Sequence, residues 1–214
     1  MNAMILAAGR GERLRPYTDT CPKPLLPVNG KPLIEYHLEA LASAGIQQVV
    51  INVNWLAEMI QHRLGNGSQY GLSICYSHEN QTLETAGGIV QALPLLHDQF
   101  IVVNGDILTD YPFHRLFNRD SSAHLVLVDN PAHNPQGDFR LDHGLIKNGG
   151  KGQHNTFSGI AVYQKSFFAQ LSPGRRALGP VLRMSADTET ISGELYAGNW
   201  IDVGTVERWH QVSS

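Results

Sequence analysis

A buried strand that runs straight into a glycine turn is the feature that most constrains how this chain folds. Residues 4–8 form an apolar run without a polar face, which is typical of a central strand in a parallel sheet. Gly9 and Gly11 follow at once, and they allow a tight turn that exposes backbone N–H groups. The pattern therefore predicts an open α/β sheet with a ligand-binding loop at the carboxyl end of its first strand.

Positive charge is concentrated in and after this loop. Its four cations, spread over fourteen residues, are Arg10, Arg13, Arg15 and Lys23. The 16 Lys and Arg of the 214-residue chain would place about one in a segment of that length. Cations beside exposed N–H groups favour a phosphate-rich ligand, although a pair of glycines after a strand also occurs in simple turns.

The loop does not match two well-known phosphate-binding motifs. No Lys-Ser or Lys-Thr pair follows the glycines, as the P-loop requires, and Leu14 stands where the dinucleotide fingerprint has its third glycine. The sequence therefore supports neither a P-loop NTPase nor a dinucleotide-binding Rossmann domain.

The composition excludes several other classes of protein. A net charge of −3 gives no bulk attraction to nucleic acid or to an anionic membrane, and no apolar run approaches the ~20 residues of a membrane span. Cys21 and Cys75 show no metal-binding or redox spacing, the ten histidines are scattered, and the amino terminus lacks the basic segment of a signal peptide. We therefore expect a cytoplasmic enzyme with reduced thiols and no nucleic-acid or membrane partner.

Strand and helix signals alternate through the first half of the chain, which predicts a mixed, mostly parallel central sheet with helices on both faces. Predicted strands lie at 4–8, 48–53, 72–76 and 100–103, and predicted helices at 32–44, 56–64 and 85–96. In the second half we predict strands at 125–128, 157–163, near Leu195 and at 200–203, helices at 178–186 and from Thr205, and a hairpin around Phe139 and Gly144. We expect that hairpin to form a flap or an edge of a small substrate lobe.

Acidic residues at the ends of two predicted strands are candidate metal ligands. Asp106 ends the segment Asn104-Gly105-Asp106 after an apolar strand, and Asp202 follows a short strand just before a helix. Each aspartate on its own would equally serve to cap a turn or a helix end. Beside a phosphate-binding loop, however, the two carboxylates form a sensible pair for Mg²⁺, which prefers hard oxygen ligands.

Two further places have both a functional and a structural interpretation. Lys23 lies between two prolines that restrict the chain, so it is a candidate for neutralising an α-phosphate, although most lysines are solvated surface residues. The segment from Glu79 to Gly88 places two glycines near a predicted helix start, where a base or sugar ring could approach the backbone. The same glycines would also allow tight packing of the helix on the sheet.

The combination of L-A-A-G-x-G-x-R-L and P-K-P-L-L-P-V resembles the signature of sugar-1-phosphate nucleotidylyltransferases. Over nearly the whole chain, segments such as L-E-T-A-G-G-I, V-N-G-D, G-D-F-R-L and W-I-D-V-G-T are similar to those of the N-acetylmuramate-1-phosphate uridylyltransferases of bacterial cell-wall recycling. The resemblance implies one Rossmann-like nucleotidyltransferase domain over residues 1–214, with a nucleotide-binding half at 1–110 and a sugar-binding half at 111–214. It also implies UTP and a sugar 1-phosphate as substrates and magnesium as the metal.

The motifs and the resemblance together assign roles to individual residues. Nucleotide binding falls to Gly11, Glu12, Arg13, Lys23, Glu79, Gly88 and Asn104, catalysis to Lys23, Arg13 and Asp106, the metal to Asp106 and Asp202, and the sugar to Asp138, Asn155 and Thr156.

Some alternatives stay open. The segment 145–155 matches the family least well and lies where sugar contacts are expected, so glucose 1-phosphate, mannose 1-phosphate and phosphocholine remain candidate substrates. A non-catalytic nucleotide-sugar sensor with the same fold is a further alternative. We expect a monomer or small homo-oligomer and, because the chain stops soon after Trp209, no second catalytic domain.

Overall fold

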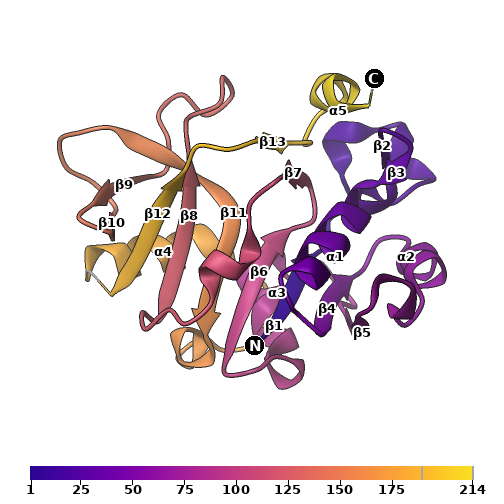
Figure 1. Ribbon diagram of the computed structural model, residues 1–214, viewed down its shortest axis with the longest axis horizontal. Helices are drawn as coiled ribbons and strands as arrows, with labels where there is room; N and C mark the ends of the chain where they lie inside the picture. Colours follow the sequence, from indigo (N-terminus) through magenta and orange to yellow (C-terminus); the bar gives the residue numbers. More distant parts are fainter. Residues whose placement is uncertain (189, 214) are drawn as a thin grey trace.

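A nine-stranded sheet runs through the whole molecule (Figure 1). The computed structural model describes residues 1–188 and 190–213. Across the sheet the strand order is β5-β4-β1-β6-β11-β8-β12-β10-β9. The strands are β1 (Asn2–Leu6), β4 (Gln48–Val53), β5 (Ser73–His78), β6 (Gln99–Asn104), β8 (Ala123–Val128), β9 (Phe139–Asp142), β10 (Leu145–Lys147), β11 (His154–Gln164) and β12 (Ile191–Tyr196).

The two halves of this sheet differ in strand direction. β5, β4, β1 and β6 pair in parallel, as the alternation of strands and helices predicts. β11 then runs antiparallel to both β6 and β8, and the β9–β10 hairpin closes the far edge after β12. The mixed α/β sheet confirms the predicted fold class, but the expectation that it is mostly parallel is wrong, because β11 and the β9–β10 hairpin pair antiparallel with their neighbours. Its parallel pairs lie in the first half and between β8 and β12.

The hairpin predicted around Phe139 and Gly144 is confirmed as β9 and β10. His143 and Gly144 connect the two strands with φ angles of 50° and 81°. Two successive positive φ values are typical of a type I′ turn, whose twist matches that of the adjoining strands. The hairpin therefore forms an edge of the sheet in the second half of the chain.

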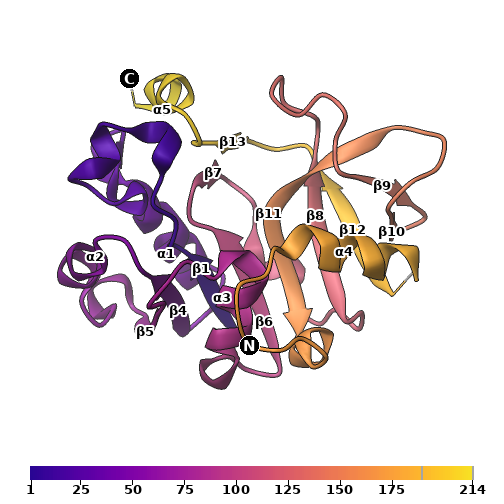
Figure 2. The ribbon, with the colours of Figure 1, turned by 180° about the vertical axis from the view of Figure 1, so that it is seen from behind.

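Two helices cover each face of the sheet (Figures 1 and 2). One face carries α1 (Leu33–Ser43) and α2 (Ala57–Leu64), and the other carries α3 (Glu84–Ala92) and α4 (Leu178–Asp187). Side chains alternate along β1, so that Ile5 belongs to the core under α1 while Met4 belongs to the core under α3. This explains why the strand is apolar on both faces.

The first strand lies two residues earlier than predicted. It covers Asn2–Leu6 and ends before Ala7, because the N–H group of Ala7 donates at 2.8 Å to the side chain of Asn52 in β4 rather than to a backbone carbonyl of that strand. Ala7 and Ala8 thereby leave the sheet and enter the turn. The apolar run predicts burial correctly here, but it does not mark where the sheet ends.

Several short elements close the edge where the parallel strands end. β7 (Ile107–Thr109) pairs antiparallel with β13 (Trp200–Asp202), and β2 (Pro27–Val28) pairs with β3 (Lys31–Pro32). The last helix, α5 (Val206–Val212), follows β13 and lies beside β2 and β3 (Figure 1). Trp209 of α5 donates its indole N–H to the carbonyl of Pro27 at 2.8 Å. The end of the chain is thus fixed against its first 30 residues.

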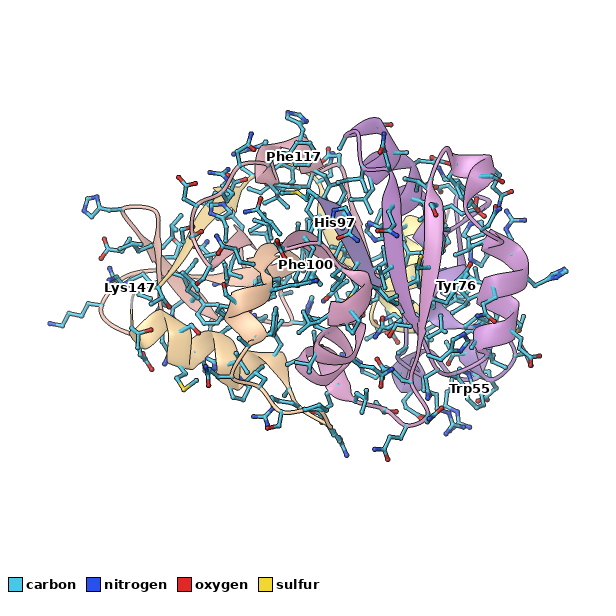
Figure 3. All side chains as sticks on the ribbon, turned by 90° about the horizontal axis from the view of Figure 1, so that it is seen from below. Trp55, Tyr76, His97, Phe100, Phe117 and Lys147 are labelled. Carbon is cyan, nitrogen blue, oxygen red and sulfur yellow. The ribbon has the colours of Figure 1, made fainter. Side chains whose placement is uncertain are left out.

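Figure 3 shows side chains filling the space between the sheet and its helices, with Phe100 in the interior. The ring of Phe100 is fully buried, and its centroid lies 6.2 Å from that of Phe168. Trp55 and Lys147 lie toward opposite ends of the molecule in the same view. Within residues 1–188 and 190–213, no helix combines the length and apolar character that spanning a membrane requires.

Candidate active site

The loop after β1 folds back on itself through three short 3-10 helices, at Glu12–Leu14, Tyr17–Asp19 and Lys23–Leu25. Gly11 has a φ of 71°, which favours glycine. A Cβ atom at this position would lie 2.9 Å from Thr18 Cγ2 and 3.2 Å from Lys23 Cβ. The missing side chain therefore allows the loop to pack on Lys23 and to bring it back to the end of β1.

A cavity of about 350 Å³ lies at the carboxyl ends of β1, β4 and β6, which is within the size range of small-molecule sites. It is lined by residues of the glycine loop, of the strand ends and of the start of α3, namely Leu6, Ala7, Ala8, Gly9, Gly11, Glu12, Arg13, Lys23, Pro24, Asn52, Glu79, Thr82, Glu84, Thr85, Asn104, Gly105, Asp106 and Gly204. Six of the seven predicted nucleotide-binding residues are in this lining, and Gly88 is the exception.

Lys23 is a buried lysine paired with a carboxylate, not a solvated surface lysine. Its Nζ donates to Oδ2 of Asp106 at 2.6 Å, and the residue is only 9% exposed. A buried ammonium group requires such a partner. The two charges face the cavity together, so a predicted cation and a predicted metal ligand lie in direct contact.

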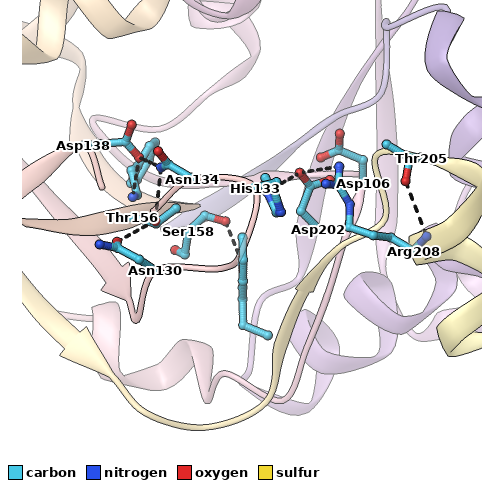
Figure 4. Close-up of polar contacts among 12 residues, drawn as sticks. Asp106, Asn130, His133, Asn134, Asp138, Thr156, Ser158, Asp202, Thr205 and Arg208 are labelled. Carbon is cyan, nitrogen blue, oxygen red and sulfur yellow. Dashed lines mark hydrogen bonds and ion pairs between the residues drawn. The ribbon is translucent and has the colours of Figure 1, made fainter. Parts of the chain in front are cut away.

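Asp106 and Asp202 come from the two halves of the chain and lie beside each other (Figure 4). The pairing of β7 with β13 sets Asp202 opposite Ile107, and the N–H group of Val203 donates to the carbonyl of Asp106 at 2.8 Å. Asp202 does not cap α5, because the side chain of Thr205 fills that role. The structure therefore favours the paired-carboxylate interpretation over two separate caps.

The oxygens of these carboxylates suit a hard cation. Oδ2 of Asp202 contacts Nη2 of Arg208 at 3.2 Å and Nε2 of His133 at 3.3 Å. Oδ1 of Asp202 is buried and has no hydrogen-bond partner among the described residues. Mg²⁺ is commonly held by one or two carboxylates together with substrate phosphates and water. Among the described residues, no group of three or more His, Cys, Asp or Glu side chains is arranged to hold a metal ion, so the role of Asp106 and Asp202 as metal ligands stays a prediction.

Asn52 and Glu79 form a buried polar network on the cavity wall. Asn52 donates to Glu79 Oε1 at 2.7 Å and accepts a hydrogen bond from Ala7 N. Oε2 of Glu79 accepts from the N–H group of Leu83 at 3.0 Å. The network ties the turn after β1 to the segment that leads into α3, and it fixes the shape of this wall.

The two glycines of α3 are explained by packing. A Cβ atom at Gly88 would lie 2.5 Å from Glu79 Oε1, and one at Gly87 would clash with the carbonyl of Gly174. Gly88 is buried and does not line the cavity. Its place behind Glu79 supports the tight-packing interpretation, and any effect on a nucleotide would act through the position of Glu79.

Arg13 is the cavity-lining cation that has no hydrogen bond or ion pair with other described residues. The carboxylate of the neighbouring Glu12 forms ion pairs with Arg10 Nε and Arg15 Nη1, each at 3.3 Å. These pairs are exposed and contribute little to stability. Arg13 is therefore available to an anionic ligand. Asn104, at the end of β6, also lines the cavity.

A neutral histidine supports the segment that carries Asp106. His37 of α1 is buried, and this burial lowers its pKa to about 4, although its hydrogen bond to the backbone of Ile107 and the charge of Asp106 act in the opposite direction. The ring is therefore uncharged at neutral pH. It contacts the first residue of β7 without adding charge beside Asp106 and Lys23.

The three predicted sugar-binding residues lie apart from the cavity and are joined to one another. Asp138 accepts a hydrogen bond from Asn134, and Thr156 accepts one from the same amide. Asn155 is buried, and its Nδ2 has no hydrogen-bond partner in the described structure. Figure 4 shows Asp138 and Thr156 on one side of His133 and the aspartate pair on the other. Their role in sugar binding stays a prediction.

Three contributors to the site were not predicted from the sequence: Asn52, His133 and Arg208. Asn52 could have been found from the sequence, because it is a polar residue that follows an apolar stretch inside a strand. Arg208 lies six residues after Asp202, and that spacing does not predict a contact between the two side chains. His133 is in a loop rich in Asn and Pro, where one histidine carries no pattern.

Arg13, Lys23 and Asp106 thus line one cavity at the strand ends, and Asp202 lies beside Asp106. Comparison with known proteins identifies the family to which the chain belongs. The sequence profile "Nucleotidyl transferase" matches residues 2–158, so the chain belongs to the nucleotidyl transferase family. It is an enzyme of that family, whose substrates are a nucleotide and a sugar phosphate and whose members generally use a divalent metal.

Among individual relatives, the N-acetylmuramate alpha-1-phosphate uridylyltransferase of Neisseria meningitidis is 53% identical over 100% of this chain and 97% of its own length. A mannose-1-phosphate guanyltransferase of Schizosaccharomyces pombe is 31% identical over 95% of this chain. A UTP–glucose-1-phosphate uridylyltransferase of Synechocystis is 30% identical over 99%. The chain spans only 61% and 62% of the lengths of the latter two.

Solved structures confirm the fold. A putative glucose-1-phosphate thymidylyltransferase from Bacillus anthracis has a TM-score of 0.88 at 21% identity, covering 100% of this chain and 94% of its own. HddC from Yersinia pseudotuberculosis, complexed with GMP-PN, has a TM-score of 0.82 at 22% identity, covering 99% and 97%. At these identities the likeness shows the Rossmann-like nucleotidyltransferase fold alone.

Proposed function

We propose that this enzyme transfers the uridylyl group of UTP to N-acetyl-α-D-muramate 1-phosphate, which yields UDP-N-acetylmuramate and pyrophosphate. The observation that carries the proposal is the 53% identity, along the full chain, to a relative named for that activity. Relatives named for mannose 1-phosphate or glucose 1-phosphate are 30–38% identical, and the two at 36% and 38% match only 62% and 63% of this chain. From the family resemblance we further propose that the reaction belongs to peptidoglycan recycling and takes place in the cytoplasm.

The proposed step is an in-line displacement. A phosphate oxygen of the sugar 1-phosphate attacks the α-phosphorus of UTP, a new P–O bond forms there, and the bond to the β-phosphate breaks as pyrophosphate leaves. A phosphate monoester is already anionic near neutral pH, so the step needs no strong general base. The chain contributes by positioning the two substrates and by neutralising charge.

The predicted site residues, inside the cavity and beside it, would each contribute to this step. Lys23 has three donors on its Nζ, so it can keep Asp106 while it also contacts an α-phosphate oxygen. Arg13 and the backbone N–H groups of the glycine loop would hold the β- and γ-phosphates. Asp106 and Asp202 would hold Mg²⁺, which when bound offsets the negative charge of the phosphates. Asp138, Asn155 and Thr156 would face the sugar from the second half of the chain.

The test is pyrophosphate release with Mg²⁺ across a panel of nucleoside triphosphates and sugar 1-phosphates. We expect release with UTP and N-acetylmuramate 1-phosphate. Release only with glucose 1-phosphate, mannose 1-phosphate or phosphocholine would refute the substrate assignment. If no pair of substrates releases pyrophosphate while UTP still binds, a nucleotide-sugar sensor is favoured instead.

A matched pair of lysine variants tests the mechanism. Lys23→Met is expected to lower the rate by about 10²–10³-fold, because it removes one electrostatic contact to the reacting phosphate. Lys31→Met, in the short strand β3 outside the cavity, is expected to keep the wild-type rate. Equal activities for the two variants would contradict the role of Lys23.

A further inference from the structure

The carboxylate of Asp202 is contacted on one oxygen only, by two side chains of the protein. Oδ2 contacts Nη2 of Arg208 at 3.2 Å and Nε2 of His133 at 3.3 Å. Oδ1 of the same carboxylate is buried and has no hydrogen-bond partner among the described residues. A buried carboxylate oxygen without a partner carries a free-energy cost. One oxygen is therefore fixed by the protein, and the other is left for a ligand.

Arg208 itself is firmly positioned. Its side chain is 16% exposed, and its Nε is buried without a partner in the described part of the chain. The helix that carries it, α5, is anchored at Pro27, whose carbonyl accepts hydrogen bonds from Trp209 and Ser213. The guanidinium group therefore reaches Asp202 from a helix that is tied to the loop segment just after Lys23.

Gly204 lies between Asp202 and the cavity. Gly204 lines the cavity, whereas Asp202 and Arg208 do not. A Cβ atom at Gly204 would lie 2.6 Å from Oδ1 of Asp202 and would clash with Nη2 of Arg208. Oδ1 of Asp202 thus lies next to Gly204, which has no side chain to cover that oxygen.

We propose that Arg208 is a positioning residue for the metal site: it holds Oδ2 of Asp202 so that Oδ1 stays directed to the bound cation. The inference rests on the proposed role of Asp202 as a metal ligand. Groups that orient a metal ligand typically affect metal affinity or activity by about 10–100-fold when they are replaced. A purely electrostatic role predicts the opposite sign, because removing a cation beside Asp202 would strengthen its attraction for a metal.

The experiment measures Mn²⁺ binding by electron paramagnetic resonance of the free ion, with UTP present and no sugar phosphate. We expect Arg208→Met to weaken Mn²⁺ binding by about 10–100-fold. Arg208→Lys, which keeps the charge but loses the guanidinium geometry, should fall between this variant and the wild type. Gln211→Ala, on the exposed side of the same helix, is the matched control and should bind as the wild type does.

Two further variants keep the test decisive. Gly204→Ala disturbs the same carboxylate from the cavity side and should also weaken Mn²⁺ binding, which covers the case in which Arg208→Met does not fold. Unchanged or tighter Mn²⁺ binding in folded Arg208→Met would overturn the inference. If Asp202→Asn also binds Mn²⁺ like the wild type, the metal assignment in the proposed function fails instead. Thermal unfolding of each variant identifies those that have lost the fold.

Discussion

Glu194 is the centre of a partly buried ionic cluster away from the cavity, and it makes the stability of this protein depend on pH. The carboxylate of Glu194 accepts a hydrogen bond from Tyr111 at 2.7 Å and pairs with Arg119 at 3.0 Å and Arg115 at 3.3 Å. Burial acts to raise the pKa of Glu194, but the neighbouring His124, the hydrogen bond from Tyr111 and the charge of Arg115 outweigh it and lower the pKa to about 2.

The sign and size of the effect follow from that pKa. The folded protein binds the proton of Glu194 less readily than the unfolded chain, in which the pKa is near 4.5. The resulting stability is therefore fully present above about pH 4.5 and is lost as the pH falls toward 2. At about 1.4 kcal/mol per pH unit, the ionised carboxylate stabilises the fold by about 3 kcal/mol at pH 7.

Glu194→Gln isolates this contribution. Urea unfolding at pH 7 should show a loss of about 3 kcal/mol in the free energy of unfolding, and the loss should shrink to about half by pH 3. Glu58→Gln, an exposed glutamate on α2, is the control and should change stability by less than about 0.5 kcal/mol. A loss in Glu194→Gln that is the same at pH 7 and pH 3 would refute the reasoning.

Three other variants test the packing around the cavity and in the core. Gly11→Ala should lower the unfolding free energy by about 1–2 kcal/mol because of its positive φ, and it should lower kcat by displacing Lys23, as measured by urea unfolding and pyrophosphate release. Asn52→Ala should raise the KM for UTP and cost about 1–3 kcal/mol, because it leaves Glu79 without its buried donor. Tyr163→Phe should leave the fold unchanged or stabilise it by about 1 kcal/mol, because its buried hydroxyl has no partner in the described residues, and an equal loss of stability in thermal unfolding would contradict this.

The sequence was a good guide wherever short-range periodicity decides the structure. The apolar run at residues 4–8 predicts a strand buried on both faces, and β1 is buried under α1 on one side and α3 on the other. The hairpin around Gly144 is recognisable because its turn needs positive φ angles. The clustered cations of the glycine loop likewise predict a site, since charges close in sequence must lie close in space.

The contacts that complete the site depend on distant parts of the chain, and local patterns do not encode them. Lys23 meets Asp106 across 83 residues, and no spacing rule predicts whether that lysine is buried or solvated. β7 and β13 have only three residues each, which is too short for a periodic signal. The roles of Asp106 and Asp202 could be proposed from their places at strand ends, whereas their juxtaposition is visible only in the fold.

The register of that small strand pair decides whether the two carboxylates meet at all. Because strand side chains alternate between faces, a shift of one residue in β13 would turn Asp202 away from Asp106. Two contacts oppose such a shift: the N–H group of Val203 donates to the Asp106 carbonyl at 2.8 Å, and the indole of Trp200 donates to the carbonyl of Ser158 at 2.9 Å. Trp200 thus helps to fix the register that places the two aspartates beside each other. The site is therefore a property of both halves of the chain, joined at one edge of the sheet.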